Sequence, residues 1–245
     1  MKDEKQSLLE HLEALRKTLL LILLGLVIGI VLAVFFVKPI IAFLAIPIGG
    51  LDQLHAIEVT ESVGVYMRVA LLTGLIVSLP WVFYQLFQFI GKGLKENERK
   101  GILIAVPFAT IMFLGGVAFA FYIMLPASLE FLMGILGIQT LIRIKSYFSF
   151  VSNLLFWIGV SFELPLIAFV LARFGILKAK VMLKSWRIAI VVIAILAAII
   201  TPTGDPVNMA IFMIPLFVLY LLSIGLAALA EKQRAKTNAA ESLEV

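Results

Sequence analysis

Six long apolar runs dominate this 245-residue chain and leave few folds open to it. Hydrophobic residues make up 62% of the sequence and charged residues 14%, whereas a soluble domain carries about 25% charged residues. A run of about 20 apolar residues is long enough to cross a bilayer as a helix. We therefore predict an all-α polytopic membrane protein with six transmembrane helices, at residues 18–37, 63–90, 102–125, 147–172, 188–201 and 207–229.

The spans follow one another too closely to separate into domains. We expect a single transmembrane domain over residues 1–230 and a polar tail over residues 231–245, which we expect to be frayed or disordered. The first apolar run is too long for the core of a signal peptide, and no A-x-A cleavage pattern follows it. It is therefore predicted to be a retained span.

Lysine and arginine are distributed very unequally among the segments between the spans. The N-terminus, the 91–101 loop, the 173–187 loop and the tail together hold sixteen of them, and the three opposite loops hold three. Basic residues accumulate on the cytoplasmic side of membrane proteins, so both termini are predicted to be cytoplasmic. The net charge of +5 is then mostly a topology signal and does not indicate a nucleic-acid partner.

The last two spans and two of the external loops are unusual. Only fourteen residues separate Arg187 from Pro202, and at about 1.5 Å per residue they fall short of a bilayer core of about 30 Å. The turn TPTGDP joins this short span to the last one. The external loops at 38–50 and 126–138 are too apolar to be solvated, so we expect short helices at the interface or capping the bundle.

Glu163 lies inside the apolar run at residues 148–172, about 15 Å along a helix from Arg173. A carboxylate near the bilayer centre costs about 2.5–3.5 kcal/mol, which the many Leu, Ile, Val and Phe residues around it offset. Intramembrane carboxylates are usually functional, although a neutral Glu hydrogen-bonded to a neighbouring helix would be a structural alternative.

Residues suited to catalysis or to cofactor binding are scarce. The two histidines, His11 and His55, fall on opposite sides of the membrane, and no protease, hydrolase or phosphate-loop motif is present. The chain has no cysteine, which excludes a disulfide and a thiolate metal site. We expect neither an enzyme nor a cofactor. A small proton-coupled transporter that uses Glu163 is the alternative, and an intramembrane protease would lack a recognisable dyad.

Two cytoplasmic segments carry carboxylates that suit recognition. Residues 7–19 are predicted to form an amphipathic helix, on which Glu10, Glu13 and Lys17 share the polar face. In the 91–101 loop, Asn97 is predicted to cap the third span, which puts Glu98 in its first turn. Both segments also allow a purely structural interpretation, as a surface helix and a helix start.

Five motifs in chain order resemble the TatC family, the multispan receptor component of the twin-arginine protein translocase. They are HLEALRKTLL, SLPWVFYQLFQFIGKGLKENERK, FAFYIMLPASLEFL, SFELPL and ITPTGDP. The resemblance implies a cup-shaped bundle in a bacterial inner membrane, with two short final spans and both termini inside. It implies binding of twin-arginine signal peptides of folded proteins, and TatA- and TatB-type single-span partners. It further implies that the chain contacts membrane lipids, associates with further copies of itself and depends on the proton-motive force. It implies no catalysed reaction.

The resemblance also implies roles for particular residues. Glu98 matches the acidic position that contacts the twin arginines, and Gln85 and Phe89 match neighbouring positions at the end of the second span. Glu163 matches the buried polar position of the fourth span. Positions in the external loops are matched by Pro47 and Asp205.

The N-terminal motif departs from the family pattern. The family places a glutamate two residues before its arginine, and this chain has Ala14 before Arg16. Glu13 lies one residue early and Glu10 one helical turn early, and either is a candidate for the missing carboxylate. We expect Glu10, Glu13 and Arg16 to act with Glu98 at the cytoplasmic surface.

Overall fold

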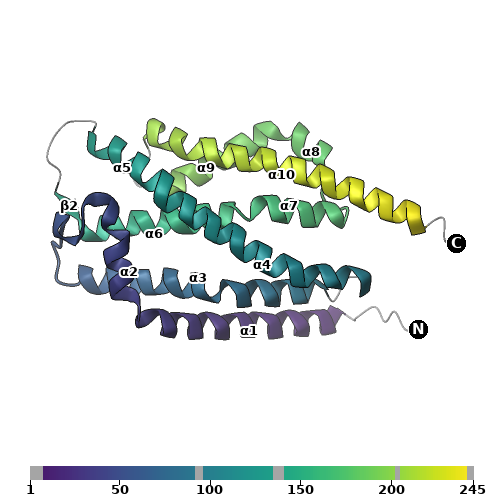
Figure 1. The fold of residues 1–245 in the computed structure, drawn as a ribbon, viewed down its shortest axis with the longest axis horizontal. Helices are drawn as coiled ribbons and strands as arrows, with labels where there is room; N and C mark the ends of the chain where they lie inside the picture. Colours follow the sequence, from purple (N-terminus) through teal and green to yellow (C-terminus); the bar gives the residue numbers. More distant parts are fainter. Residues whose placement is uncertain (1–7, 92–95, 135–140, 202–204, 242–245) are drawn as a thin grey trace. The chain divides into compact units, whose positions relative to one another are not determined.

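The computed structural model describes residues 8–91, 96–134, 141–201 and 205–241 (Figure 1). The larger elements are helices, and they are listed here in chain order: α1 (Leu8–Val34), α2 (Val37–Leu44), α3 (Glu61–Gly91), α4 (Glu96–Phe119), α5 (Leu125–Gly134), α6 (Ile144–Ser161), α7 (Leu164–Arg173), α8 (Ala179–Lys184), α9 (Trp186–Ile200) and α10 (Pro206–Glu241). Shorter elements are the helical turns η1 (Ile46–Ile48), η2 (Leu51–Gln53) and η3 (Ala120–Met124) and the strands β1 (Leu54–His55) and β2 (Ile142–Arg143).

Five stretches of the described chain are long and apolar enough to cross a membrane: Leu12–Val34, Glu61–Phe89, Ala105–Gly134, Ile144–Arg173 and Pro206–Ala235. They correspond to five of the six expected spans. The remaining one, α9, has 15 residues and so measures about 22 Å, which agrees with its predicted shortness. The protein is therefore a multi-pass membrane protein.

The chain divides into two compact units, Met1–Ile111 and Met112–Val245, and each is described by itself. In the first unit, α1 and α3 run antiparallel and pack closely. A methyl group at Gly29 of α1 would lie 2.6 Å from the carbonyl oxygen of Gly74 and 3.0 Å from Cβ of Ser78. Gly29 thus faces Gly74 and Ser78, which are four residues apart on α3, and these small residues let the two backbones approach.

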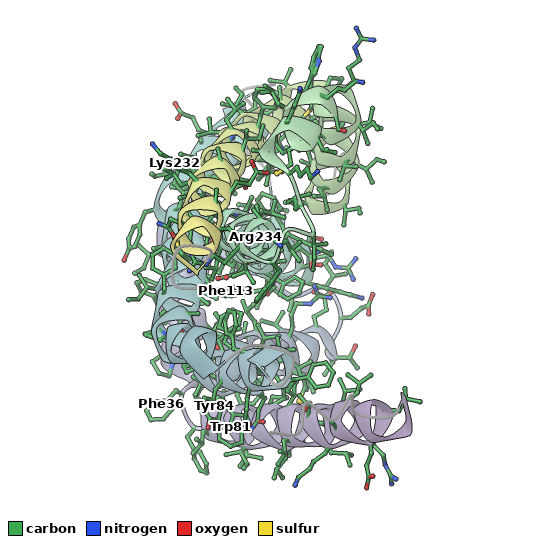
Figure 2. The ribbon with its side chains drawn as sticks, turned by 90° about the vertical axis from the view of Figure 1, so that its right-hand side faces the viewer. Phe36, Trp81, Tyr84, Phe113, Lys232 and Arg234 are labelled. Carbon is green, nitrogen blue, oxygen red and sulfur yellow. The ribbon has the colours of Figure 1, made fainter. Side chains whose placement is uncertain are left out.

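Two side-chain hydrogen bonds fix the register of α1 against α3. The indole Nε1 of Trp81 donates to the carbonyl oxygen of Leu21 over 2.8 Å, and the indole ring lies over Gly25. Near the other end, the hydroxyl of Tyr66 donates to the carbonyl oxygen of Val34 over 2.8 Å. Figure 2 shows Trp81 and Tyr84 together beside α1, with ring centroids 6.0 Å apart.

In the second unit, α10 packs along α7 and also contacts α8 and α9. Small side chains allow this approach: Ala172 and Ala179 form one buried cluster with Ala227 and Ala230 of α10. Two hydrogen bonds extend the packing toward the end of α10. Glu231 accepts a hydrogen bond from the amide of Ala179 over 2.8 Å, and Arg173 donates to Gln233 over 3.1 Å. The Arg234 guanidinium packs over Gly175.

Two helix ends differ from expectation. The short helix expected within residues 126–138 is present over its described part as α5 (Leu125–Gly134), but no loop separates it from the third span, because α4 continues through η3 into α5. The wide π-type turn of η3 (Ala120–Met124) comes directly before Pro126, and it accommodates a proline that cannot donate to the preceding turn. The polar tail is not frayed over its described part, since α10 extends to Glu241 and contacts α7 and α8.

Candidate functional site

The register of α1 against α3 places several predicted site residues at one end of the first unit. Leu21 is level with Trp81, and Val34 is level with Tyr66. The same antiparallel register, continued toward the N-terminus, brings Arg16 level with the turn around Gln85 and Glu13 level with the turn around Phe89. Residues far apart in sequence are therefore level with one another at this end of the α1–α3 pair, which we call the recognition end.

The residues at the recognition end differ in accessibility. Glu13 and Arg16 are exposed, Phe89 is half-buried, and Gln85 is only 4% exposed. Gln85 therefore belongs to the packed interior of this end, and Glu13 and Arg16 belong to its surface. Thr18, one turn further along α1, is also buried.

The other two predicted carboxylates lie on helix starts. Glu10 lies in the first turn of α1, and Glu98 lies in the first turn of α4. Their side chains fall outside the described part of the chain. Because α4 begins at Glu96, Asn97 lies within its first turn, so the expectation that Asn97 precedes and caps the helix is wrong. A carboxylate in a first turn interacts favourably with the positive end of the helix dipole.

Glu163 lies at a break between two helices of the second unit. It was expected within one continuous helix, but α6 ends at Ser161 and α7 begins at Leu164. The amide of Phe162 donates to the carbonyl oxygens of Ile158 and Gly159, and the amide of Glu163 donates to that of Val160 over 3.1 Å. Pro165 has no N–H to continue the ladder, which accounts for the interruption.

The carboxyl group of Glu163 is buried, and one of its oxygens has no partner. Glu163 is 6% exposed, its carboxyl lies against the backbone of Phe113, and its Oε1 atom has no hydrogen-bond partner. Nearby, the rings of Phe119 and Phe162 lie 5.6 Å apart, and the Phe162 ring packs on Gly116. A buried acceptor without a partner carries a cost that a hydrogen-bond donor brought by another molecule would remove.

The two external-loop residues have different local roles. Pro47 is half-buried in η1 at the first turn, a position that suits its fixed φ. Asp205 precedes α10, where its Oδ1 accepts a hydrogen bond from the amide of Asn208 over 2.7 Å. Asp205 is thus the cap of the last long helix.

Several structurally important residues were missed from the sequence. The spacing Gly25-x3-Gly29 and Gly74-x3-Ser78 was a usable signal, because small residues four apart mark close helix pairs in membranes. Asn208 was also missed: it is fully buried and neither its Oδ1 nor its Nδ2 has a hydrogen-bond partner. Among the residues that the structure describes, no group of three or more acidic or His side chains could hold a metal ion.

Comparisons with known proteins agree on one family. A family model described as "Sec-independent protein translocase protein (TatC)" matches residues 10–215. A TatC of Carboxydothermus hydrogenoformans is 35% identical over 93% of this chain and 95% of its own length. The TatCy protein of Bacillus subtilis is 33% identical over 98% of this chain and 96% of its own length.

Solved structures give the same result. The crystal structure described as "Twin Arginine Translocase Receptor- TatC" superposes with a TM-score of 0.82 at 30% sequence identity. The match covers 90% of this chain and 99% of that one. A second crystal structure of the receptor, in the detergent DDM, superposes with a TM-score of 0.83 at 29% identity.

Proposed function

The chain belongs to the TatC family of Sec-independent protein translocase proteins, and from this premise we propose that it is the receptor for twin-arginine signal peptides. As a family member it is a multi-pass component of the twin-arginine translocase. We further propose that it acts in a bacterial inner membrane with both termini in the cytoplasm. The excess of Lys and Arg in the N-terminus, the tail and the two loops on their side supports this orientation.

The single observation that carries the proposal is the register of α1 against α3. It brings Glu13 and Arg16 level with the end of α3, and the chain reaches Glu98 seven residues after Gly91. We infer from this that a carboxylate of α1 and the one at the start of α4 lie on the same side of the membrane. Gln85, which is buried in α3, is proposed to support this end.

The chemistry of the recognition end fits a pair of adjacent arginines. A guanidinium is planar and offers parallel N–H donors, and a carboxylate accepts two of them at once. In the proposed complex Glu98 accepts hydrogen bonds from one arginine, and Glu10 or Glu13 accepts them from the other. Glu10 or Glu13 thereby takes the role of the family glutamate, whose position is occupied by Ala14 in this chain. The apolar part of the signal peptide then lies against the apolar spans.

Glu163 is assigned to a different step. We propose that its carboxyl group accepts a hydrogen bond from a polar group in the span of a TatA- or TatB-type subunit. This contact would form during assembly of the translocase, which is driven by the proton-motive force. The unpartnered Oε1 and the broken helix at Phe162 support this role, because they provide an acceptor that the protein itself leaves unused. Pro47 and Asp205 are proposed to shape the external loops that partners and further copies of the chain contact.

Substitutions of Glu98 provide the test of the recognition site. Removing one charged partner of a guanidinium–carboxylate pair costs about 1.5–3 kcal/mol, so Glu98→Gln should weaken binding of a twin-arginine peptide about 10- to 100-fold. Glu98→Lys should weaken it further by repulsion. Photo-cross-linking of a labelled peptide to the full chain in vesicles measures the effect, and a twin-lysine peptide provides the reference for weak binding.

The same assay separates the two N-terminal carboxylates. Glu10→Gln and Glu13→Gln are to be measured singly, with Lys17→Gln as a control on the same helix. Peptide binding that is insensitive to Glu98→Gln would contradict the assigned site. Binding that responds to Glu98 but to neither N-terminal substitution would assign the second arginine to another acceptor.

The transporter alternative is not favoured, since the matching relatives are named as translocase components. Purified protein in liposomes separates the two classes. A proton-coupled transporter would carry out solute flux by itself, and flux would depend on Glu163. A receptor binds the signal peptide and produces no flux without its partners.

A further inference from the structure

The short helix α8 (Ala179–Lys184) is held firmly on one side. Its first amide, that of Ala179, donates to Glu231, and the carbonyl oxygen of Met182 accepts a hydrogen bond from the hydroxyl of Tyr220. Ala179 is buried and Met182 is half-buried in the alanine-rich cluster shared with α7 and α10. The side of α8 that faces α10 is therefore occupied, and its opposite side has a defined orientation.

The opposite side of α8 carries two lysines with apolar flanks. Lys180 and Lys184 are four residues apart, so they lie one turn apart on the same face of the helix, and both are exposed. Val181 and Leu183 border them and are 54% and 60% exposed. This face combines a pair of positive charges with exposed apolar surface.

The charge of this face has little compensation nearby. Residues 164–204 contain no aspartate or glutamate. Glu231, an acidic residue that contacts α8, already accepts a hydrogen bond from the amide of Ala179. Like charges four residues apart on a helix destabilise it, so an anion between Lys180 and Lys184 would stabilise the arrangement.

The sequence after α8 fixes its depth relative to the membrane. Trp186 begins α9 and is 48% exposed, and the guanidinium of Arg187 lies 5.7 Å from the centre of its ring. Tryptophan prefers the headgroup level of a bilayer, and α9 is apolar from Ile188 onward. The lysines of α8 therefore lie where the phosphates of phospholipids lie, at the start of a span that is only about 22 Å long.

We propose that the outer face of α8 and the first turn of α9 form a binding site for the headgroups of anionic phospholipids. Lys180, Lys184 and Arg187 donate to phosphate oxygens, and Val181, Leu183 and Trp186 contact the glycerol and upper acyl region beside them. The apolar flanks and the depth favour a lipid over an acidic soluble segment, which would gain nothing from exposed leucine and valine. This site lies outside the recognition end and does not depend on peptide binding.

Native mass spectrometry of the purified full chain tests the proposal. The protein is prepared in detergent micelles that contain equal amounts of phosphatidylglycerol and phosphatidylcholine, and the bound lipids are counted. We expect bound phosphatidylglycerol to exceed phosphatidylcholine. Each basic residue near a membrane surface contributes about a fivefold preference for anionic lipid, so Lys180→Gln or Lys184→Gln should lower the ratio about fivefold. Lys180→Arg with Lys184→Arg should retain it.

A matched variant controls for net charge. Lys38→Gln with Lys145→Gln removes two exposed charges elsewhere and should leave the ratio unchanged. An equal loss in both double variants, or a ratio that persists in Lys180→Gln with Lys184→Gln, would overturn the proposal. Tight binding of a polyglutamate peptide in phosphatidylcholine micelles would also overturn it, if that binding matches the affinity for phosphatidylglycerol and requires the same lysines. Twin-arginine peptide binding should be unchanged in the α8 variants, which separates this test from that of the recognition site.

Discussion

Glu163 shows how one residue can combine a local cost with a proposed role. Its side chain is buried, and one carboxyl oxygen has no partner. An apolar side chain of similar volume would remove that cost, which for an unsatisfied buried polar atom is about 1–3 kcal/mol. The role proposed for Glu163, an interaction that forms in the assembled translocase, would offset this cost.

Glu163→Leu should therefore separate stability from assembly. We expect the midpoint of thermal unfolding in detergent to rise, because the unpartnered oxygen is gone, while co-purification of a TatA- or TatB-type subunit falls severalfold. Glu163→Gln keeps a polar group at the break and should retain more of the partner. Glu130→Leu, at an exposed position of α5, is the control for removal of a glutamate. Full partner recovery with Glu163→Leu would contradict the docking role.

At the scale of elements, the close pair α1–α3 depends on the absence of side chains at its contact. A methyl group at Gly29 would meet the backbone of Gly74, which cannot move without shifting α3. Overpacking of this kind costs about 1–3 kcal/mol. The recognition end depends on this contact, because the register of α1 against α3 places Glu13 and Arg16.

Gly29→Ala should lower the midpoint of thermal unfolding and also weaken twin-arginine peptide binding. Gly64→Ala on α3 is the matched control, since nothing lies within 4 Å of the added methyl group. Alanine is the better helix former, so the midpoint of the control should stay the same or rise slightly. If the two variants behave alike, the close contact at Gly29 does not hold the register.

A second element-scale prediction concerns the contact between α8 and α10. Glu231→Ala removes the acceptor of the Ala179 amide and should loosen α8. Hydrogen exchange of a peptide covering residues 176–185 should accelerate, because protection of an amide reflects the free energy of local opening. Lys232→Ala, one position away and exposed, should leave the exchange rate unchanged. Equal exchange in the two variants would show that α8 is held by its apolar contacts alone.

The sequence predicts the apolar elements well and their ends poorly. The spans and the short α9 follow from hydropathy and counting, which depend on the bilayer alone. The continuation of α4 into α5 does not follow from hydropathy, because a proline at 126 usually ends a helix. The π-type turn that accommodates this proline leaves no local signature in the sequence. The helical tail was missed for a related reason, since its order comes from contacts with residues 60 and 52 positions earlier, at Arg173 and Ala179.

The sequence proposes the residues of the candidate site but does not give their geometry. Carboxylates near helix starts and a charge in an apolar run are visible in the sequence. The burial of Gln85 and the helix break at Glu163 are not, because both depend on packing against residues remote in the chain. The register of α1 with α3 rests on Trp81 and Tyr66, two side chains that composition and periodicity do not distinguish from ordinary membrane aromatics.

At the scale of the whole molecule, the orientation in the membrane can be measured cleanly because the chain has no cysteine. A single cysteine at Val59, which is 96% exposed, should react with a membrane-impermeant maleimide in intact cells. Cysteines at Lys17 and Lys232, both exposed, should react only after the membrane is opened. Labelling at position 17 or 232 in intact cells would contradict the orientation proposed from the distribution of Lys and Arg.

The glycine contact between α1 and α3 also bears on how the protein is made. Each compact unit is a continuous stretch of chain, and the first ends at Ile111, before the second has to be synthesised. Its backbone-to-backbone contact needs no partner from later in the sequence. The N-terminal hairpin can therefore close while the ribosome is still translating the rest, as domains generally do during synthesis. A Gly29 substitution would then reduce the yield of inserted protein at the first step of biogenesis, before any signal peptide is encountered.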